Sequence, residues 1–179
     1  MRIISGQFKG FRFNPPAKNW PTRPTTDISK EGLYNILQNS IDFEEITFLD
    51  LFGGTGNHCY EVISRGCEEA TYVDRFGACV AFVKSIAQKL GIEDKINIVK
   101  MDVFKFIKTS NKSFDYIFAG PPYPLKNIPD IPDLIFEYGL LNEGGLFVLE
   151  HNPNVDVSSH PKYENQRNYG QTIFSFFRH

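Results

Sequence analysis

The chain has 179 residues, of which 41% are hydrophobic and 22% charged, and its formal net charge is −2. This length suits one globular domain with a small appendage and allows a sizeable core. No run approaches the roughly 20 apolar residues of a membrane span, and the first residues do not resemble a signal peptide. We therefore expect a soluble, cytoplasmic protein without a membrane partner, acting as a monomer.

The cysteines argue against a disulfide framework and against a zinc site. Cys59, Cys67 and Cys79 are odd in number and show no CxxC spacing. Disulfide scaffolds and zinc sites usually carry paired cysteines at short, regular spacings. We expect buried thiols and no bound metal.

Positive charge gathers in the first 26 residues, which contain no carboxylate although the whole chain is slightly acidic. A basic segment on an acidic body is typical of a contact surface for phosphates. An ordinary solvated cationic surface explains the charge equally well. The cations are Arg2, Lys9, Arg12, Lys18 and Arg23.

The N-terminal part of the chain predicts an extension before the main domain. Residues 2–14 alternate weakly around two glycines, which favours a short β-hairpin. Several prolines then keep the chain extended, and Thr26 or Asp27 can cap a helix with one apolar face. We therefore expect a basic hairpin and helix over residues 1–40, followed by a domain over residues 41–179.

Short apolar runs alternate with amphipathic stretches from residue 46 onward. Strands this apolar, separated by helices, are typical of a parallel sheet covered on both faces, and therefore of an α/β fold. The expected strands are 46–52, 70–74, 96–100, 114–120 and 145–151. The expected helices are 57–66, 77–90, 103–109 and 130–139.

The last 18 residues follow a different pattern. Residues 162–170 and 171–179 are both rich in β-forming residues, and no helix separates them at Gly170. They predict an antiparallel hairpin at one edge of the sheet. The whole sheet would then have seven strands, with the last one antiparallel.

The strongest local motif is FLDLFGGTGN, residues 48–57. An apolar strand runs directly into a glycine-rich turn, and Asn57 could cap the following helix, so backbone N–H groups point beyond the strand end. The carboxylate of Asp50 would favour the ammonium of an amino acid over a pyrophosphate. A tight turn without a ligand is the alternative. The expected ligand residues here are Asp50, Phe52, Gly53, Gly54, Thr55, Gly56 and Asn57.

Two further acids follow the next two expected strands. Asp74 lies where a carboxylate can accept hydrogen bonds from both hydroxyls of a ribose, and Arg75 or Phe76 could cover an adenine face. Asp102 could accept from the adenine amino group while the backbone of Val103 serves the ring edge. Capping of a helix by Asp102 explains that residue equally well.

The segment FDYIFAGPPYPL, residues 114–125, ends a buried strand with two prolines and an aromatic ring. Proline cannot donate to the sheet, so the strand stops there and the backbone carbonyls point toward a fixed place. The ring of Tyr123 could stack on a planar base. Such acceptors around an exocyclic amine favour attack on a methyl group; a plain proline-rich turn is the alternative.

Together these motifs resemble a known family. The glycine turn, the acids, the PPY segment, RPTTD at residues 23–27, SRG at 64–66 and LEH at 149–151 are similar to the bacterial small-subunit ribosomal RNA guanine methyltransferases. The resemblance implies a Rossmann-like class I methyltransferase fold. It also implies S-adenosylmethionine as cofactor and methylation of a guanine exocyclic amine, with ribosomal RNA or the small ribosomal subunit as partner. In this resemblance, the glycine turn and the acids named above would bind the cofactor. The residues at the reacting amine would be Gly120, Pro121, Pro122 and Tyr123. Arg23 and Thr25 would lie over the cofactor or the RNA.

The chain departs from that family at Gly120, where the family tetrapeptide begins with Asp or Asn. The side chain that would accept from the target amine is missing. Two alternatives therefore stay open: a catalytically impaired or non-catalytic RNA-binding homologue, and a nicotinamide-dependent oxidoreductase. The second does not explain PPY, and Cys59 stands where a dinucleotide fingerprint needs its third glycine.

Overall fold

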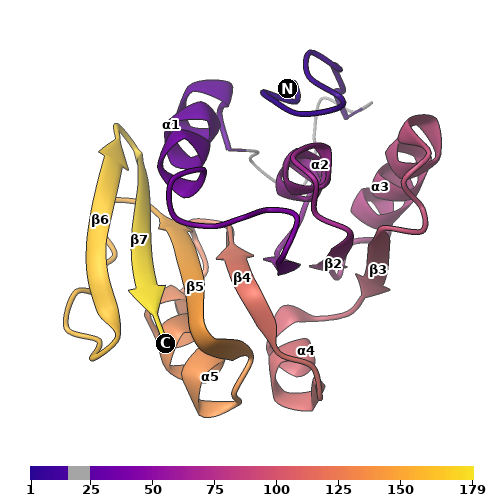
Figure 1. The fold of residues 1–179 in the computed structure, drawn as a ribbon. Coiled ribbons are helices and arrows are strands. Elements are labelled where there is room, and N and C mark those ends of the chain that lie inside the picture. The colour runs from indigo at the N-terminus through magenta and orange to yellow at the C-terminus, as the bar shows by residue number, and fades with distance from the viewer. Residues whose placement is uncertain (16–24) are drawn as a thin grey trace.

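The computed structural model describes residues 1–15 and 25–179. Its centre is a seven-stranded sheet in the order β3-β2-β1-β4-β5-β7-β6 (Figure 1). The first five strands of this order pair in parallel, and β7 runs antiparallel to both of its neighbours. The strands are β1 Thr47–Leu51, β2 Glu69–Asp74, β3 Ile96–Lys100, β4 Phe114–Ala119, β5 Leu141–His151, β6 Tyr163–Tyr169 and β7 Thr172–Arg178.

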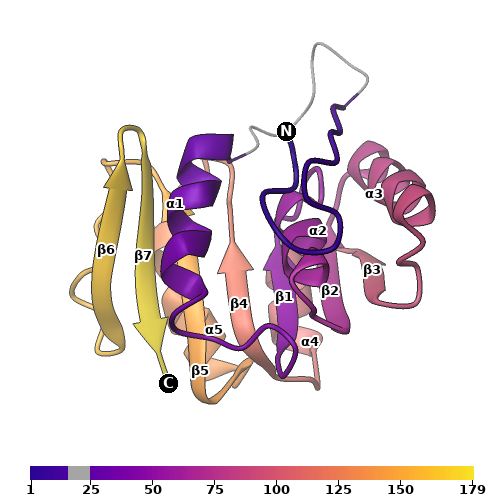
Figure 2. The same ribbon diagram turned by 45° about the horizontal axis from the view of Figure 1, so that its top comes forward.

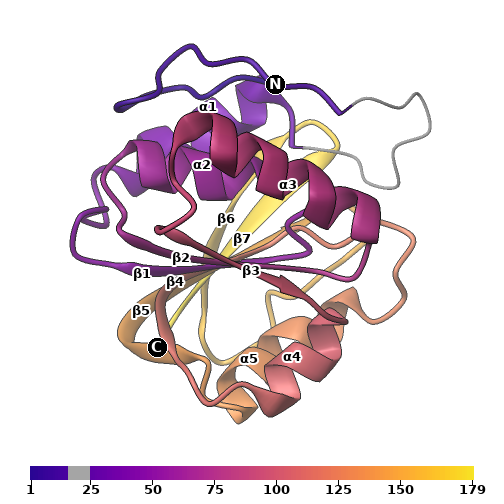
Figure 3. The same ribbon diagram turned by 90° about the vertical axis from the view of Figure 1, so that its right-hand side faces the viewer.

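Helices cover both faces of the sheet, as Figure 3 shows edge-on. One face carries α1, α2 and α3, and the other carries α4 and α5. The central strands β1 and β4 are therefore shielded from water on both sides, which explains their largely apolar sequences, whereas the edge strand β3 exposes Asn97 and Lys100. The helices are α1 Asp27–Leu37, α2 Asn57–Ser64, α3 Gly77–Leu90, α4 Val103–Thr109 and α5 Ile131–Glu137, with a 3-10 turn η1 at Ile128–Asp130.

Alternate residues of each strand enter different cores. Phe48 of β1 packs in the core under α1, α2 and α3, whereas Leu49 and Leu51 pack in the core under α4 and α5. This alternation follows from the two-residue period of a strand. The predicted α/β fold, with its terminal antiparallel hairpin at one sheet edge, is confirmed. Strand β5 is longer than expected, because it starts at Leu141 and not at residue 145.

The expected N-terminal hairpin forms as a short antiparallel pair with one bridge, between Arg2 and Arg12. The N–H groups of Ile3 and Phe13 donate across it to the carbonyls of Phe11 and Met1, at 3.0 and 3.2 Å. Other backbone donors of the segment bond to α2. The N–H groups of Ile4 and Ser5 donate to the carboxylate of Glu61 at 2.8 and 3.1 Å, and that of Gln7 donates to a carbonyl at the end of α2. The short hairpin therefore lies on α2, as Figure 2 shows.

A buried cation ties the N-terminal segment, α1 and α2 together. Lys30 of α1 has a fully buried side chain that donates to the backbone oxygen of Arg2 at 2.6 Å and lies 3.1 Å from the Glu61 carboxylate. Ile3 and Phe13 are buried in the same core as Leu33 of α1. The division into an extension, 1–40, and a domain, 41–179, stays a prediction, but the two share one hydrophobic core.

Candidate active site

A cavity of about 670 Å³ opens at the carboxyl ends of β1, β2, β4 and β5. This volume is within the range of about 300 to 1,000 Å³ that small-molecule sites span. All but one of the expected cofactor residues line it, the exception being Gly56 in the turn itself. The expected residues that line the cavity are Asp50, Phe52, Gly53, Gly54, Thr55, Asn57, Asp74, Arg75, Asp102, Val103, Gly120, Pro121, Pro122, Tyr123 and Thr25.

The glycine turn is shaped by close packing against β2. Gly54 and Gly56 have φ values of 53° and 76°, a region that glycine enters without a steric penalty. Phe52 also has a positive φ, 59°, which is uncommon for a residue with a side chain. A Cβ atom on Gly53 would lie 2.4 Å from the ring of Tyr72, so only glycine fits beside that ring.

Asp74 holds the glycine turn against the end of β2. Its carboxylate accepts from the N–H of Gly54 at 2.9 Å and from the N–H of Phe76 at 2.8 Å. Burial raises the pKa of Asp74, and these backbone donors partly oppose that rise. The acid therefore fixes the turn and also faces the cavity.

Asp50 is a buried acid at the end of β1, with 1% of its surface exposed. Burial raises its pKa to about 8, and the nearby carboxylates of Asp74 and Glu150 add to the rise. The thiol of Cys59 donates to Asp50 at 3.5 Å, which opposes the rise. A carboxyl group in this state favours a cationic group beside it, because a positive charge would restore its ionised form.

Asn57 does not cap α2, contrary to the expectation. The cap residue is Gly56, and Asn57 is already the first helical residue. The Asn57 side chain turns to Lys30, whose ammonium donates to Asn57 Oδ1 at 2.7 Å. Satisfying the buried ammonium takes precedence over capping, since an unpaired charge in the core is costly.

Asp102 caps α4 by accepting from the N–H of Lys105 at 3.1 Å. Its side chain remains exposed at the cavity, while Val103 beside it is buried. On the neighbouring strand end, the guanidinium of Arg75 lies 4.9 Å from the centre of the Phe76 ring. The residues after β2 and β3 therefore form the cavity wall that lies opposite the end of β4.

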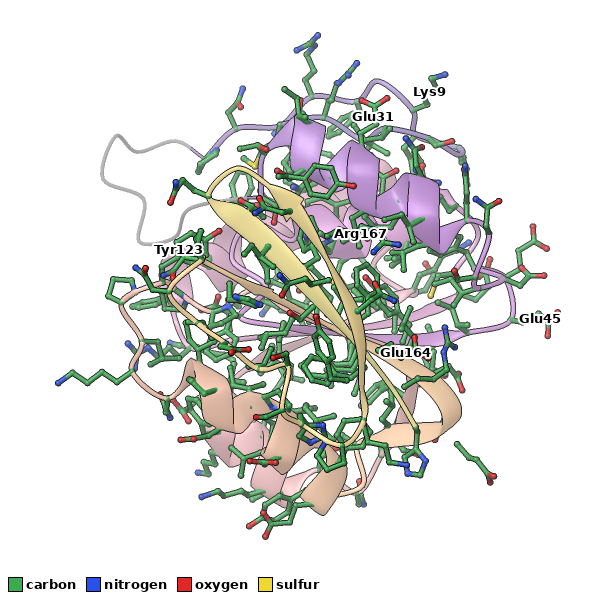
Figure 4. All side chains as sticks on the ribbon, turned by 90° about the vertical axis from the view of Figure 1, so that its left-hand side faces the viewer. Lys9, Glu31, Glu45, Tyr123, Glu164 and Arg167 are labelled. Atoms are coloured by element: carbon green, nitrogen blue, oxygen red, sulfur yellow. The ribbon has the colours of Figure 1, made fainter. Side chains whose placement is uncertain are left out.

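The PPY segment begins where β4 stops. Gly120 still donates to the carbonyl of Leu51 at 3.2 Å, after which the two prolines leave the sheet and Leu125 closes a turn on the carbonyl of Pro122. Tyr123 lies at the edge of the molecule in Figure 4. Its hydroxyl donates to Glu150 Oε1 at 3.1 Å, so the ring is held beside the cavity from β5.

A chain of hydrogen bonds that the sequence did not predict runs through the cavity wall. Tyr34 lies 3.2 Å from Nδ1 of His58, whose Nε2 lies 3.1 Å from the Thr25 hydroxyl. Thr25 in turn donates to Glu150 Oε2 at 2.5 Å, and Tyr123 donates to the other oxygen. Burial lowers the pKa of His58 well below 6.5. The sequence had singled out Thr25, Tyr123 and the LEH motif at 149–151, but not His58, Tyr34 or the bonds that join these residues.

Of the expected RNA-contacting residues that the structure describes, Thr25 lines the cavity and the three cations do not. Arg2, Lys9 and Arg12 are exposed, and Arg2 lies near Asp27 and Glu31 of α1, at 3.6 and 3.8 Å. Figure 4 shows Lys9 far from Tyr123. Thr25 is 8% exposed and belongs to the cavity wall, not to a basic surface. Two further expected residues lie outside the described part of the chain: Lys18 and Arg23.

Neither a metal centre nor a membrane span is found in the described residues. No three His, Cys, Asp or Glu side chains in residues 1–15 and 25–179 are grouped so that they could hold a metal ion. Within the same residues, every helix is too short or too polar to cross a lipid bilayer.

Comparison with known proteins places the chain among methyltransferases. A Bacillus subtilis protein named "Putative rRNA methyltransferase YlbH" is 34% identical over 160 residues, which cover 88% of this chain and 85% of the relative. The ribosomal RNA small subunit methyltransferase D of Buchnera aphidicola subsp. Baizongia pistaciae is 29% identical over 150 residues, covering 84% of this chain and 75% of the relative.

A solved structure shares the fold over nearly the whole chain. The structure described as "Putative methyltransferase yhhF from Escherichia coli" has a TM-score of 0.84 at 23% identity and covers 99% of this chain and 96% of its own. Other chains of the same fold were solved with S-adenosylhomocysteine bound to them. The family model described as "Conserved hypothetical protein 95" matches residues 1–178. The chain therefore belongs to the Conserved hypothetical protein 95 family, with relatives named as ribosomal RNA methyltransferases.

Proposed function

We propose that this protein uses S-adenosylmethionine to methylate a guanine exocyclic amine in small-subunit ribosomal RNA. One observation carries the proposal: a single cavity joins the glycine turn and the acids of β1, β2 and β3 to the PPY segment after β4. A donor site and an acceptor site therefore share one space, as methyl transfer requires. The names of the relatives support ribosomal RNA as the substrate class.

The cavity fits the cofactor in charge as well as in size. Asp50, with its pKa raised to about 8, favours the ammonium of the methionine end, and the backbone of the glycine turn lies beside it. Asp74 would accept from the ribose hydroxyls, since a carboxylate offers about four acceptor positions and two are taken by backbone donors. Asp102 and Val103 would hold the adenine.

The chain's own residues act mainly by positioning. S-adenosylmethionine supplies an already activated methyl group, so the protein needs to align acceptor and donor and to exclude water. The carbonyls of Pro121 and Pro122 would orient the amine, and Tyr123 would stack on a base turned out of the RNA. No residue has to form a covalent bond to the substrate.

The test is methylation of ribosomal RNA by the purified protein. We expect label from methyl-labelled S-adenosylmethionine to appear in small-subunit ribosomal RNA, and mass spectrometry of the nucleosides to identify N2-methylguanosine. Naked RNA and assembled subunits are assayed side by side. Label in another base, or at another atom of guanine, would contradict the proposed acceptor.

Binding measurements separate this proposal from the two alternatives. We expect S-adenosylhomocysteine, but not NADH, to raise the melting temperature. Stabilisation by NADH alone would favour an oxidoreductase. Binding of S-adenosylhomocysteine and of RNA without any methylation would favour a non-catalytic homologue.

A further inference from the structure

The carboxylate of Glu150 lies beside Gly120, the position directly after β4 where the family resemblance expects Asp or Asn. Strands β4 and β5 pair in parallel with Ala119 opposite Leu149, so the next residues, Gly120 and Glu150, are neighbours at the sheet edge. A Cβ atom at position 120 would lie 4.0 Å from Glu150 Oε2. An acid at position 120 would bring its carboxylate into the same part of the cavity.

The surroundings of Glu150 fix its carboxylate in an acceptor role. Only 6% of the residue is exposed, and both of its oxygens accept from hydroxyl groups, one from Thr25 and the other from Tyr123. Because Thr25 uses its proton toward Glu150, the Nε2 of the neutral His58 donates to Thr25. The Tyr34 hydroxyl lies 3.2 Å from the other ring nitrogen. The hydroxyl protons of Thr25 and Tyr123 are thus both directed toward the carboxylate.

We propose that Glu150 accepts a hydrogen bond, and then the proton, from the target amine, in place of an acid at position 120. The inference rests on the function proposed above and adds the residue that completes its acceptor site. It assigns to a β5 residue the role that the family resemblance gave to the first position of the tetrapeptide. Gly120 then leaves room for the amine to reach Glu150.

The step balances without any further reactant. The lone pair of the amine nitrogen forms a bond to the methyl carbon, and the carbon–sulfur bond of the sulfonium breaks with its electron pair staying on sulfur, which becomes a neutral thioether. The nitrogen then carries a positive charge and loses one proton. That proton passes to the Glu150 carboxylate and from there to water when the product leaves.

The same geometry predicts that an acid at position 120 speeds methyl transfer only when residue 150 carries no charge, as in Glu150→Gln. In Gly120→Asp the new carboxylate would stand beside that of Glu150, and two like charges at such a distance do not both ionise easily. The new Cβ atom would also lie 3.2 Å from the ring of Phe118. We therefore expect no gain from Gly120→Asp alone.

Four variants test the assignment by single-turnover methylation of ribosomal RNA. Glu150→Gln keeps the shape but removes the charge, and Glu150→Gln with Gly120→Asp returns a carboxylate from the neighbouring strand. Gly120→Asp is tested alone. Glu143→Gln is the matched control, since Glu143 lies exposed near the start of the same strand.

We expect Glu150→Gln to slow methyl transfer by about 10- to 150-fold, the scale of one charge-assisted hydrogen bond. Its affinity for S-adenosylhomocysteine should stay within about twofold of wild type. The double variant should recover at least tenfold of the lost rate, whereas Gly120→Asp and Glu143→Gln should not exceed wild type.

Three results would overturn the inference while leaving the proposed function intact. These are a wild-type rate in Glu150→Gln, a slow Glu150→Gln that the second substitution does not rescue, and a gain of tenfold or more in Gly120→Asp alone. The gain in Gly120→Asp alone would overturn the inference even if Glu150→Gln does not fold. A folded wild-type protein that methylates no ribosomal RNA would instead overturn the proposed function, and the inference with it.

Discussion

Asp50 is an acid that the fold keeps out of water. Within the described part of the chain, the only side chain that donates to it is the thiol of Cys59, and both Asp74 and Glu150 raise its pKa further. A carboxyl group buried in this way costs little when protonated and much when ionised. It is therefore set up to exchange its proton for a cation that enters the cavity.

This exchange makes cofactor binding depend on pH. With a pKa of about 8 in the free protein, Asp50 is mostly protonated at pH 7, and an ammonium must displace that proton. Affinity for S-adenosylhomocysteine should fall by up to about tenfold per unit as the pH drops from 8 to 6. Calorimetry in two buffers of different ionisation enthalpy should count about one proton released at pH 7.

The control for the proton count is Asp50→Asn, which cannot ionise. It should bind more weakly at pH 8, with a flatter pH dependence and little proton release. Any slope that remains belongs to Asp74, whose pKa is also raised. A variant that releases as many protons as wild type would contradict the assignment to Asp50.

Asp74 carries a second prediction at the same scale. Asp74→Ala should weaken binding of S-adenosylhomocysteine by about 1.5 to 3 kcal/mol, the scale of a hydrogen bond to a charged group. The glycine turn also loses its acceptor, so the melting temperature is measured in parallel. Glu69→Ala, at the exposed start of the same strand, should bind as wild type does. Unchanged affinity in Asp74→Ala would refute its role at the ribose.

At the scale of single elements, local pattern predicted most of the sheet. The apolar runs gave the five parallel strands, and the missing helix before residue 171 gave the terminal hairpin, because these features depend on residues close in sequence. The N-terminal hairpin forms as predicted, but nothing in its own sequence indicated that it bonds to Glu61 and Ser64 on a distant helix. Such a partner cannot be read from local alternation.

The ion pair of Lys30 and Glu61 fastens α1 to α2, and its loss should be costly. Both side chains are fully buried, and Arg65 also bonds Glu61, at 2.9 Å. Glu61→Gln leaves the ammonium without its charge partner, which typically costs about 3 to 5 kcal/mol. Urea unfolding should show this loss, while Glu61→Gln combined with Lys30→Met should be less destabilised than Glu61→Gln alone.

The matched control for this pair is Glu31→Gln on the exposed face of α1. Its ion pair with Arg2 spans 3.8 Å at a surface position, where such pairs contribute at most about 1 kcal/mol. Equal destabilisation by Glu31→Gln and Glu61→Gln would show that burial is not what makes the inner pair important.

At the scale of the whole molecule, the sequence predicted which strand ends meet at the cavity better than it predicted the hydrogen bonds in the cavity wall. The glycine turn and the acids after β1, β2 and β3 follow strand ends, and parallel strand ends meet at one edge. Those hydrogen bonds join Thr25, His58 and Glu150, which come from three distant parts of the chain. Only the folded structure brings them together.

The basic N-terminal segment bears on how a large RNA would be held. Removing residues 1–26 would be a poor test, because Ile3 and Phe13 are buried in the core and Thr25 is part of the cavity wall. Neutralising exposed cations is cleaner. Lys9 and Arg12 are exposed and form no ion pair with the described residues, whereas Arg2 lies near two carboxylates of α1.

We expect Lys9→Gln with Arg12→Gln to flatten the salt dependence of RNA binding. Each lost phosphate contact should reduce the slope of log affinity against log salt by about 0.7 to 0.9, because fewer counterions are released. Affinity for S-adenosylhomocysteine should not change. Lys105→Gln with Lys108→Gln removes the same charge from α4, on the opposite face of the sheet, and should leave the slope as it is. If both double variants changed the slope equally, the effect would come from net charge and not from an RNA contact at the N-terminal segment.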